Sequence, residues 1–369
     1  MTFRISKLPA GRTGAALLMG GALVGLFAAC EPRAQGYGDP PELDHSRFDP
    51  VRLASEVVTD ADFLGLPKEI EVVGQYLVLL DAASDSAVHV VRREDGALVR
   101  AFGRRGEGPG EFTGTWSIET VPGNDEEFWV YDVGLLRLSR IDLKRVLEGL
   151  DPVAQMVHLA AEAQVLDPVW IDTMVVGLGI LTDGRLSIFD RNGRFLRRVG
   201  PEPPGSENVP PSVRHHVYQS KLKANASRTR LVSATRHTDL LEIYDLEGNR
   251  LAAPTPPFGF MPRFEVREQR GMSVMATGDD LRFGYIDLTA TDDRIYALFS
   301  GRTRMGFPGA ANFGEYVHVF DWEGGLKAVY RLDSAAISIS VDPAGRTLYA
   351  VRHEPKPSIV KYSLPAVRE

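Results

Sequence analysis

Cysteine is almost missing from this sequence, because Cys30 is the only one among 369 residues. A chain with one thiol forms no internal disulfide, so a disulfide-stapled scaffold is excluded and stability must come from a large hydrophobic core. Basic residues are also in deficit, with 42 Lys and Arg against 49 Asp and Glu. This balance argues against the basic surface of a nucleic-acid-binding protein. We therefore expect no nucleic-acid partner.

Established catalytic and cofactor-binding motifs are absent as well. The sequence contains no Gly-x-Ser-x-Gly nucleophile elbow. The glycine-rich stretch FGRRGEGPGEF (Phe102–Phe112) has the spacing of a phosphate-binding loop, but neither Lys-Ser nor Lys-Thr follows it and no helical pattern begins after it. We interpret it as a connection between two strands. The sequence thus predicts no catalytic residue and no cofactor.

Candidate metal ligands are scattered along the chain. His215 and His216 are the only adjacent histidines, and no third ligand stands at a spacing typical of zinc sites. His89 and His318 each lie between two valines, which predicts solvent-facing positions on half-buried strands. Acids such as Asp81, Asp132 and Glu119 are more typical of side chains that bond backbone amides in turns. The sequence therefore predicts no metal ligand.

The N-terminal segment has the features of an export signal. Three basic residues and no acidic residue precede the apolar run Gly14–Ala29, which ends at Cys30. Sixteen residues are enough for the apolar region of a signal peptide and too few for a typical membrane-spanning helix. Residues 31–50 follow with four prolines and two glycines, a composition typical of a flexible linker. The sequence predicts a signal peptide over residues 1–29 and a tether over residues 30–50.

The segment LFAAC (Leu26–Cys30) resembles the lipobox of bacterial lipoproteins, a family in which the signal is cut before a cysteine that then carries acyl chains. The resemblance implies lipidation of Cys30, attachment to a membrane through that lipid, and a place in the bacterial cell envelope on the periplasmic or outer-surface side. An uncleaved anchor helix and a plain signal peptide with an incidental cysteine are the alternatives. All three place the remaining chain outside the cytoplasm.

One pattern of apolar strands, polar turns and Gly-containing tight turns recurs six times. Its copies are residues 76–103, 128–143, 174–200, 231–253, 295–332 and 348–364, at intervals of about 50 residues. Turns such as Asp95-Gly96 and Asn192-Gly193 supply the positive φ that short hairpins need. This period is typical of propeller blades. We predict an all-β fold, a six-bladed β-propeller that forms one closed ring over residues 51–369, with residues 51–58 pairing with the last blade.

Two segments resemble known propeller families. FGRRGEGPGEF, with the strand FWVYD that ends at Asp132, resembles the NHL-type repeat. FGYIDLTATDDRIYALFSGR (Phe283–Arg302) resembles the TolB-like six-bladed propeller lipoproteins of some Gram-negative bacteria. The resemblance implies the six-bladed fold and no particular activity.

Two long insertions are the remaining functional clue. Gly200–Leu222 and Pro254–Asp280 exceed ordinary connections between blades, and the second contains the apolar stretch PTPPFGFMPRF. Long loops on a rigid scaffold often bind ligands, although these could instead pack over the ring. We predict a membrane-anchored, non-catalytic module that binds a protein, a glycan or a small molecule. The alternative is a metal-dependent, lactonase-like hydrolase, which requires carboxylate and amide groups from several blades to converge on a metal in the central channel.

Overall fold

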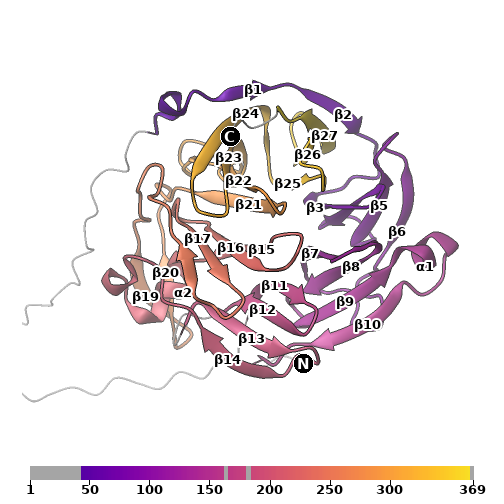
Figure 1. The fold of residues 1–369 in the computed structure, drawn as a ribbon, viewed down its shortest axis with the longest axis horizontal. Coiled ribbons are helices and arrows are strands. Elements are labelled where there is room, and N and C mark those ends of the chain that lie inside the picture. The colour runs from indigo at the N-terminus through magenta and orange to yellow at the C-terminus, as the bar shows by residue number, and fades with distance from the viewer. Residues whose placement is uncertain (1–42, 162–164, 180–183, 366–369) are drawn as a thin grey trace, which may run out of the picture. The chain divides into compact units, whose positions relative to one another are not determined.

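The computed structural model describes residues 43–161, 165–179 and 184–365. The predicted signal peptide, Cys30 and most of the predicted tether lie outside these residues. Within them, the chain forms six antiparallel blades around a common axis and one separate hairpin (Figure 1). No helix in these ranges combines the length and apolarity needed to span a membrane.

Each of the first four blades uses four consecutive strands, and the first strand of each lies nearest the axis. Blades one and two contain β3 (Pro67–Val73), β4 (Tyr76–Asp81), β5 (Val88–Arg92) and β6 (Leu98–Phe102), then β7 (Thr115–Val121), β8 (Asn124–Asp132), β9 (Arg137–Asp142) and β10 (Val153–His158). Blades three and four contain β11 (Leu166–Ile171), β12 (Met174–Leu178), β13 (Leu186–Asp190) and β14 (Phe195–Val199), then β15 (Ser220–Ala224), β16 (Arg230–Thr235), β17 (Leu241–Asp245) and β18 (Arg250–Ala252).

The last two blades take their outermost strands from the N-terminal segment. Blade five contains β21 (Tyr285–Ala290), β22 (Ile295–Phe299), β23 (Gly314–Phe320), β24 (Leu326–Ala336) and β1 (Val51–Leu53), and blade six contains β25 (Ser338–Val341), β26 (Thr347–Arg352), β27 (Ser358–Ser363) and β2 (Ser55–Thr59). The remaining elements lie outside the blades and are the hairpin β19 (Glu265–Gln269) and β20 (Met272–Ala276), the helices α1 (Leu143–Glu148) and α2 (Arg214–Val217), and the 3-10 turns η1 (His45–Phe48), η3 (Ser206–Asn208) and η4 (Pro211–Val213).

The innermost strands close the ring. They contact one another in the order β3, β7, β11, β15, β21, β25 and back to β3. Between each pair of neighbouring blades lies a layer of buried apolar side chains, such as Val78, Ile118 and Phe128 between blades one and two. The predicted all-β, six-bladed ring is therefore confirmed.

The same layers bury two histidines that the sequence placed in solvent, so that prediction is wrong. His89 and His318 are 1% and 0% exposed. His89 Nε2 lies 3.2 Å from Ser84 Oγ, and His318 Nδ1 lies 3.2 Å from the hydroxyl of Tyr285. The reason is that a propeller blade packs against a neighbour on both faces, so alternation along its middle strands marks no solvent side.

The N-terminal strands join blades five and six. β2 pairs with β27 in antiparallel fashion, as the sequence predicted. β1 instead pairs in parallel with β24 of blade five, so the prediction that the whole segment joins the last blade is wrong for residues 51–53. The crossing between the blades is fixed by Asp333, whose Oδ2 accepts hydrogen bonds from the amide and hydroxyl of Ser55 at 2.8 and 2.9 Å.

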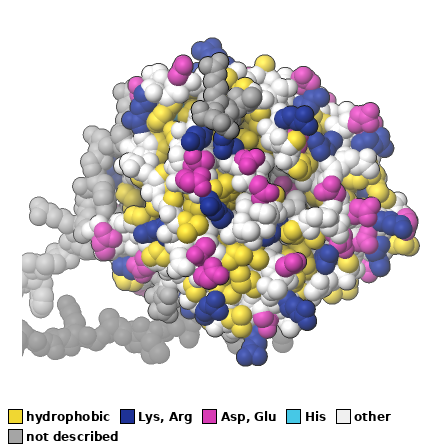
Figure 2. Space-filling view, in the orientation of Figure 1, with side chains coloured by type: hydrophobic (Ala, Val, Ile, Leu, Met, Phe, Trp, Pro, Cys, Tyr) yellow, Lys and Arg dark blue, Asp and Glu magenta, His cyan; other side chains and the backbone are white. Residues whose placement is uncertain are grey.

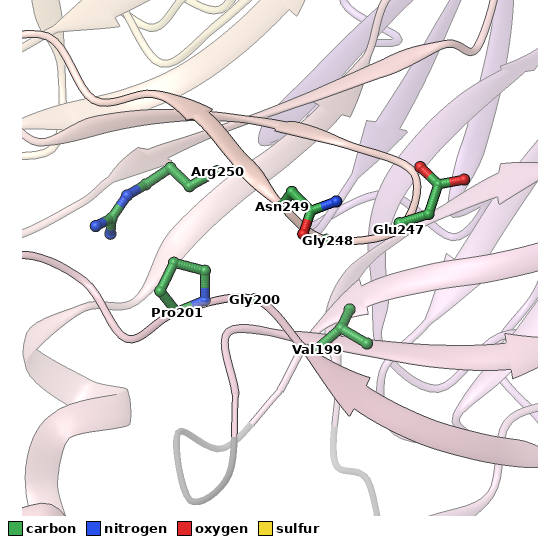
Figure 3. Close-up of a pocket in the computed structure, with 7 residues that line it drawn as sticks. All are labelled: Val199, Gly200, Pro201, Glu247, Gly248, Asn249 and Arg250. Atoms are coloured by element: carbon green, nitrogen blue, oxygen red, sulfur yellow. The ribbon is translucent and has the colours of Figure 1, made fainter.

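Glycines in the outer turns let neighbouring blades touch at the rim. At three places the outermost strand of one blade ends against a turn of the next blade. That turn connects the third and fourth strands of the next blade. A Cβ at Gly96 would lie 2.1 Å from the carbonyl oxygen of Val58, and one at Gly193 would lie 1.9 Å from that of His158. In Figure 3 the Gly248 turn passes close to Val199 in the same way, beside an open groove at the rim. These glycines are needed for positive φ and for close approach.

The glycine-rich segment connects blades one and two, as interpreted from the sequence. Residues 103–114 lead from β6 to β7. The amide of Phe112 donates to the carbonyl of Arg104, and the buried Phe112 ring covers Gly103, which has a φ of 85°. The segment is thus a structural connection.

Candidate functional site

The axis of the ring is filled by charged side chains from its innermost strands. The ammonium of Lys221, on β15, lies 2.9 Å from Glu69 Oε2, 3.6 Å from Asp287 Oδ1 and 3.7 Å from Asp167 Oδ1. The three carboxylates come from blades one, five and three, and each of these residues is at most 4% exposed. One lysine therefore holds together the acids of three other blades.

A second lysine repeats the arrangement two residues farther along β15. Lys223 Nζ lies 2.8 Å from Glu119 Oε1 and 3.0 Å from Glu71 Oε2, and it donates to the carbonyl of Ile118 at 2.8 Å. Arg228 contacts the other oxygen of Glu119 at 3.1 Å. Because β-strand side chains alternate, residues 221 and 223 point the same way and stack along the axis.

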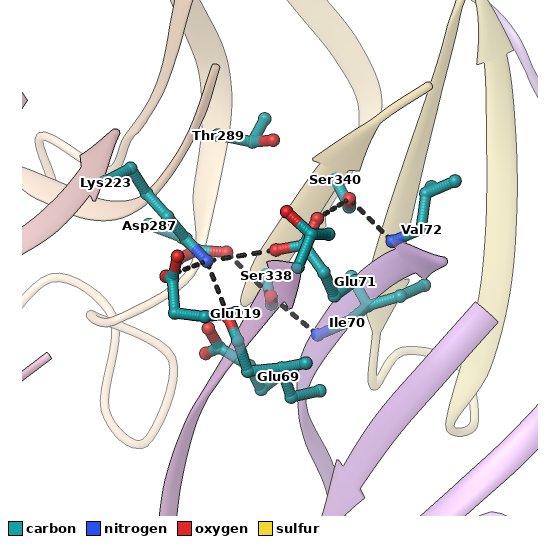
Figure 4. A network of polar contacts seen from close by, with 12 residues as sticks. Glu69, Ile70, Glu71, Val72, Glu119, Lys223, Asp287, Thr289, Ser338 and Ser340 are labelled. Carbon is teal, nitrogen blue, oxygen red and sulfur yellow. Dashed lines mark hydrogen bonds and ion pairs between the residues drawn. The ribbon is translucent and has the colours of Figure 1, made fainter. Parts of the chain in front are cut away.

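Blade six contributes hydroxyls to this network. Ser338 Oγ donates to Asp287 Oδ2 at 2.6 Å and Ser340 Oγ donates to Glu71 Oε1 at 2.7 Å. The two serine hydroxyl oxygens also accept hydrogen bonds from backbone amides, Ser338 Oγ from Ile70 and Ser340 Oγ from Val72 (Figure 4). All six blades thus meet in one set of polar contacts, which we call the axial network.

Burial and mutual attraction set the protonation of the axial network. Burial alone would lower the pKa of Lys221, but Asp167, Glu69 and Asp287 together raise it above its ordinary value. Burial raises the pKa of Glu69, to about 8, although Lys221 opposes this shift. Burial likewise raises the pKa of Asp167. The lysines therefore stay charged, while Glu69 and Asp167 take up protons more readily than exposed carboxylates do.

The axial network does not fit a metal ion. A divalent cation requires several oxygen ligands around one free point, and here the points where carboxylates converge are taken by the ammonium groups of Lys221 and Lys223. In the three ranges that the structure describes, no group of three or more His, Cys, Asp or Glu side chains is arranged to hold a metal. The arrangement joins blades and buries charge.

Comparison with known proteins agrees with this architecture. The family model described as TolB-like 6-blade propeller-like matches residues 48–344. The chain belongs to this family. No curated protein matches it.

Solved structures are similar to this TolB-like propeller at low identity. A member of the duf4221 family from Bacteroides vulgatus has a TM-score of 0.55 and 10% identity, over 86% of this chain and 98% of that one. The β-propeller domain of Cps50 (Swd1) from Myceliophteria thermophila has a TM-score of 0.45 and 12% identity, over 84% and 100%. BamB from Moraxella catarrhalis has a TM-score of 0.36 and 12% identity, over 80% and 71%.

The three acids that the sequence analysis considered as metal ligands, Asp81, Asp132 and Glu119, lie at different places in this TolB-like propeller. Asp81 and Asp132 end the second strands of blades one and two, and each carboxylate accepts four backbone amides. The interpretation of strand-end aspartates as turn residues is correct for both. Glu119 differs because it belongs to the axial network.

The adjacent histidines lie with their rings close together. His215 and His216 lie in α2, and their ring centroids are 3.9 Å apart. Burial lowers the pKa of His215 to about 4 and also lowers that of His216. Both rings are therefore neutral near pH 7.

Sequence reasoning missed most of the axial network, although a signal for it exists. KEIEV (Lys68–Val72) and SKLKA (Ser220–Ala224) each place two like charges at alternate positions beside buried apolar residues. Such a pattern places two charges on one face of an innermost strand. Each of the six copies of the repeat begins at the second strand of a blade, so the repeat does not include the innermost strands.

The long insertions all emerge on one side of the ring. Because the strands of a blade alternate in direction, the connections between them alternate between the two sides of the ring. The connections from one blade to the next lie on the same side as those between second and third strands. We define the long-loop face by the four longest of these connections in the described chain, residues 103–114, 200–219, 253–284 and 300–313. Phe258 and Phe260 of the third segment pack into the core, as the packing alternative predicted.

Two segments of the long-loop face carry exposed apolar side chains. Met305 and Met272 are 71% and 66% exposed, and Phe307 and Val266 lie on the same two segments. The amide of Met305 donates to the carbonyl of Asp279 at 2.7 Å, which ties these segments together. On the face shown in Figure 2, basic and acidic side chains are interspersed with hydrophobic ones.

Proposed function

We propose that this TolB-like propeller is a lipid-anchored, non-catalytic binding module of the bacterial cell envelope, on the periplasmic or outer-surface side. The lipid is carried by Cys30, residues 30–50 form the tether, and the long-loop face binds a protein, a glycan or a small molecule. Two observations support the binding role. The acids that could have formed an axial catalytic site are engaged by the protein's own lysines, and the most exposed methionines lie on the long-loop face.

Lipidation is tested on Cys30. Mass spectrometry of the membrane-extracted protein is expected to find a mature N-terminus at Cys30 with added acyl chains, because the preceding sequence resembles a lipobox. The Cys30→Ser variant should leave the membrane fraction, since acyl chains supply the attachment. Intact residues 1–29 or a free thiol at Cys30 would contradict the proposal.

Binding through the long-loop face is tested by photo-cross-linking in cells that produce the protein. A photoreactive amino acid at Met305 or Met272 is expected to form a discrete adduct, because these side chains are exposed on the binding face. Leu147 is a matched control, since it is 43% exposed on α1, between β9 and β10 at the opposite ends of the strands. Equal adducts at all three positions, or none at any, would refute a binding role for this face.

A further inference from the structure

A cavity of about 500 Å³ opens on the long-loop face between blades one and two. Its lining comes from the start of β3, the connection between β4 and β5, the glycine-rich connection 103–114 and the start of β7. Its size is within the range typical of small-molecule sites. The charged groups that line it are Lys68, Arg105, Asp81 and Asp85.

Lys68 is a part-buried cation with spare hydrogen-bond donors. It precedes Glu69, which faces the axis, so the side chain of Lys68 points to the other face of β3, toward blade two. Its ammonium donates to the carbonyl of Thr115. An ammonium has three donors, and among the described residues no carboxylate forms an ion pair with this one. Burial lowers the pKa of Lys68, although Glu69 opposes the shift.

Arg105 is a second cation without an acidic partner. It lies in the glycine-rich connection, where its backbone forms a bridge with Phe112. The neighbouring Arg104 pairs with Glu111 at 2.7 Å, whereas no described carboxylate pairs with Arg105. The backbone bridge fixes the base of the Arg105 side chain at the edge of the cavity.

Neither acid of the cavity forms an ion pair with Lys68 or Arg105 in the described chain. Asp81 accepts amides from Gly65, Leu66, Ala83 and Ser84, so its oxygens are occupied by the backbone. Asp85 is exposed, and within the described chain its carboxylate has no hydrogen bond or ion pair. The cavity therefore contains two unpaired cations and one unpaired acid.

We propose that this cavity binds a small molecule through a carboxylate or phosphate group held against Lys68 and Arg105. An ammonium and a guanidinium with free donors form strong charge-assisted hydrogen bonds with such an anion. The bound anion also compensates the desolvation of Lys68. This inference rests on the proposed binding function and names the class of ligand that the long-loop face takes.

The test uses succinate and inorganic phosphate as probes of the two anionic groups. Isothermal titration of the purified full chain at constant ionic strength is expected to show binding of at least one of them. Lys68→Met should weaken that binding about tenfold, since one charge-assisted contact is worth about 1.4 kcal/mol or more. Arg105→Gln should weaken it less, and Asp85→Asn should strengthen it by removing a like charge.

Lys144→Met is the matched control, because Lys144 is exposed on α1 and should leave the affinity unchanged. If Lys68→Met fails to fold, Arg105→Gln on an exposed connection still tests the site. Absence of binding by both probes, or equal losses in Lys68→Met and Lys144→Met, would overturn the inference. Failure of the titrations would overturn only the anion site in this cavity. The proposed binding role of the long-loop face is tested separately, by the cross-linking at Met305 and Met272.

Discussion

Replacement of Lys221 by methionine is expected to lower the free energy of unfolding by about 3–5 kcal/mol, the usual cost of removing one partner from a buried ion pair. The variant leaves Glu69, Asp167 and Asp287 facing one another without a cation between them. Urea denaturation at pH 8 measures the loss. Lys144→Met on the surface of α1 is the control and should change stability by less than about 0.5 kcal/mol.

The loss in Lys221→Met should shrink as the pH falls toward 5. A carboxyl whose pKa is raised in the folded state binds its proton more tightly there than in the unfolded chain, so it favours folding as the pH falls through the folded pKa. Burial raises the pKa of Asp167 while Lys221 lowers it, so loss of the cation raises this pKa further and the variant gains stability as Asp167 takes up its proton. A loss of stability that is the same at pH 5 and pH 8 would show that the carboxylates do not depend on Lys221.

Gly193→Ala is expected to destabilise the ring by about 3 kcal/mol or more. The residue has a φ of 83°, and the added Cβ would lie 1.9 Å from the carbonyl oxygen of His158 in the neighbouring blade. Relief of this clash requires the two backbones to separate, which also strains the hydrogen bond from the amide of Ala160 to the carbonyl of Gly193 at 3.0 Å. Thermal and urea unfolding measure the effect.

Gly271→Ala separates the cost of the positive φ from the cost of the clash between blades. Gly271 also has a positive φ, of 76°, but a Cβ there meets no atom within 4 Å. The control should therefore lose only the conformational term, about 1 kcal/mol. Equal losses in the two variants would mean that contact between blades at the rim adds nothing to stability.

The blade count could be predicted from the sequence because each blade repeats the same local chemistry. Apolar strands separated by turns such as Asn192-Gly193 recur about every 50 residues, and the structure places those turns where the repeat indicated. The pairing of β1 with blade five instead of blade six could not be predicted in this way. Its parallel pairing with β24 depends on contacts between residues almost 280 positions apart.

The axial network was hidden for a related reason. Lys221 and Glu69 each resemble a solvated surface charge when their own segment is considered alone. Their roles appear only when six innermost strands meet, because each charge is compensated by a partner on another blade. The burial of His318 also depends on distant segments, since its ring lies against Phe258 of the connection 253–284 and against His45 and Phe48 of the N-terminal segment.

The position of β1 and β2 sets the order in which the chain can fold. The contact between Ser55 and Asp333 spans 278 residues, and β2 pairs only with the last strand of the chain, β27. A growing polypeptide lacks both partners at first, so these two strands remain unpaired until β24 and β27 have been made. Pairings of such long sequence separation also form slowly. Ring closure is therefore a late step of folding, because β1 and β2 obtain their partners only after the strands of blades five and six are available.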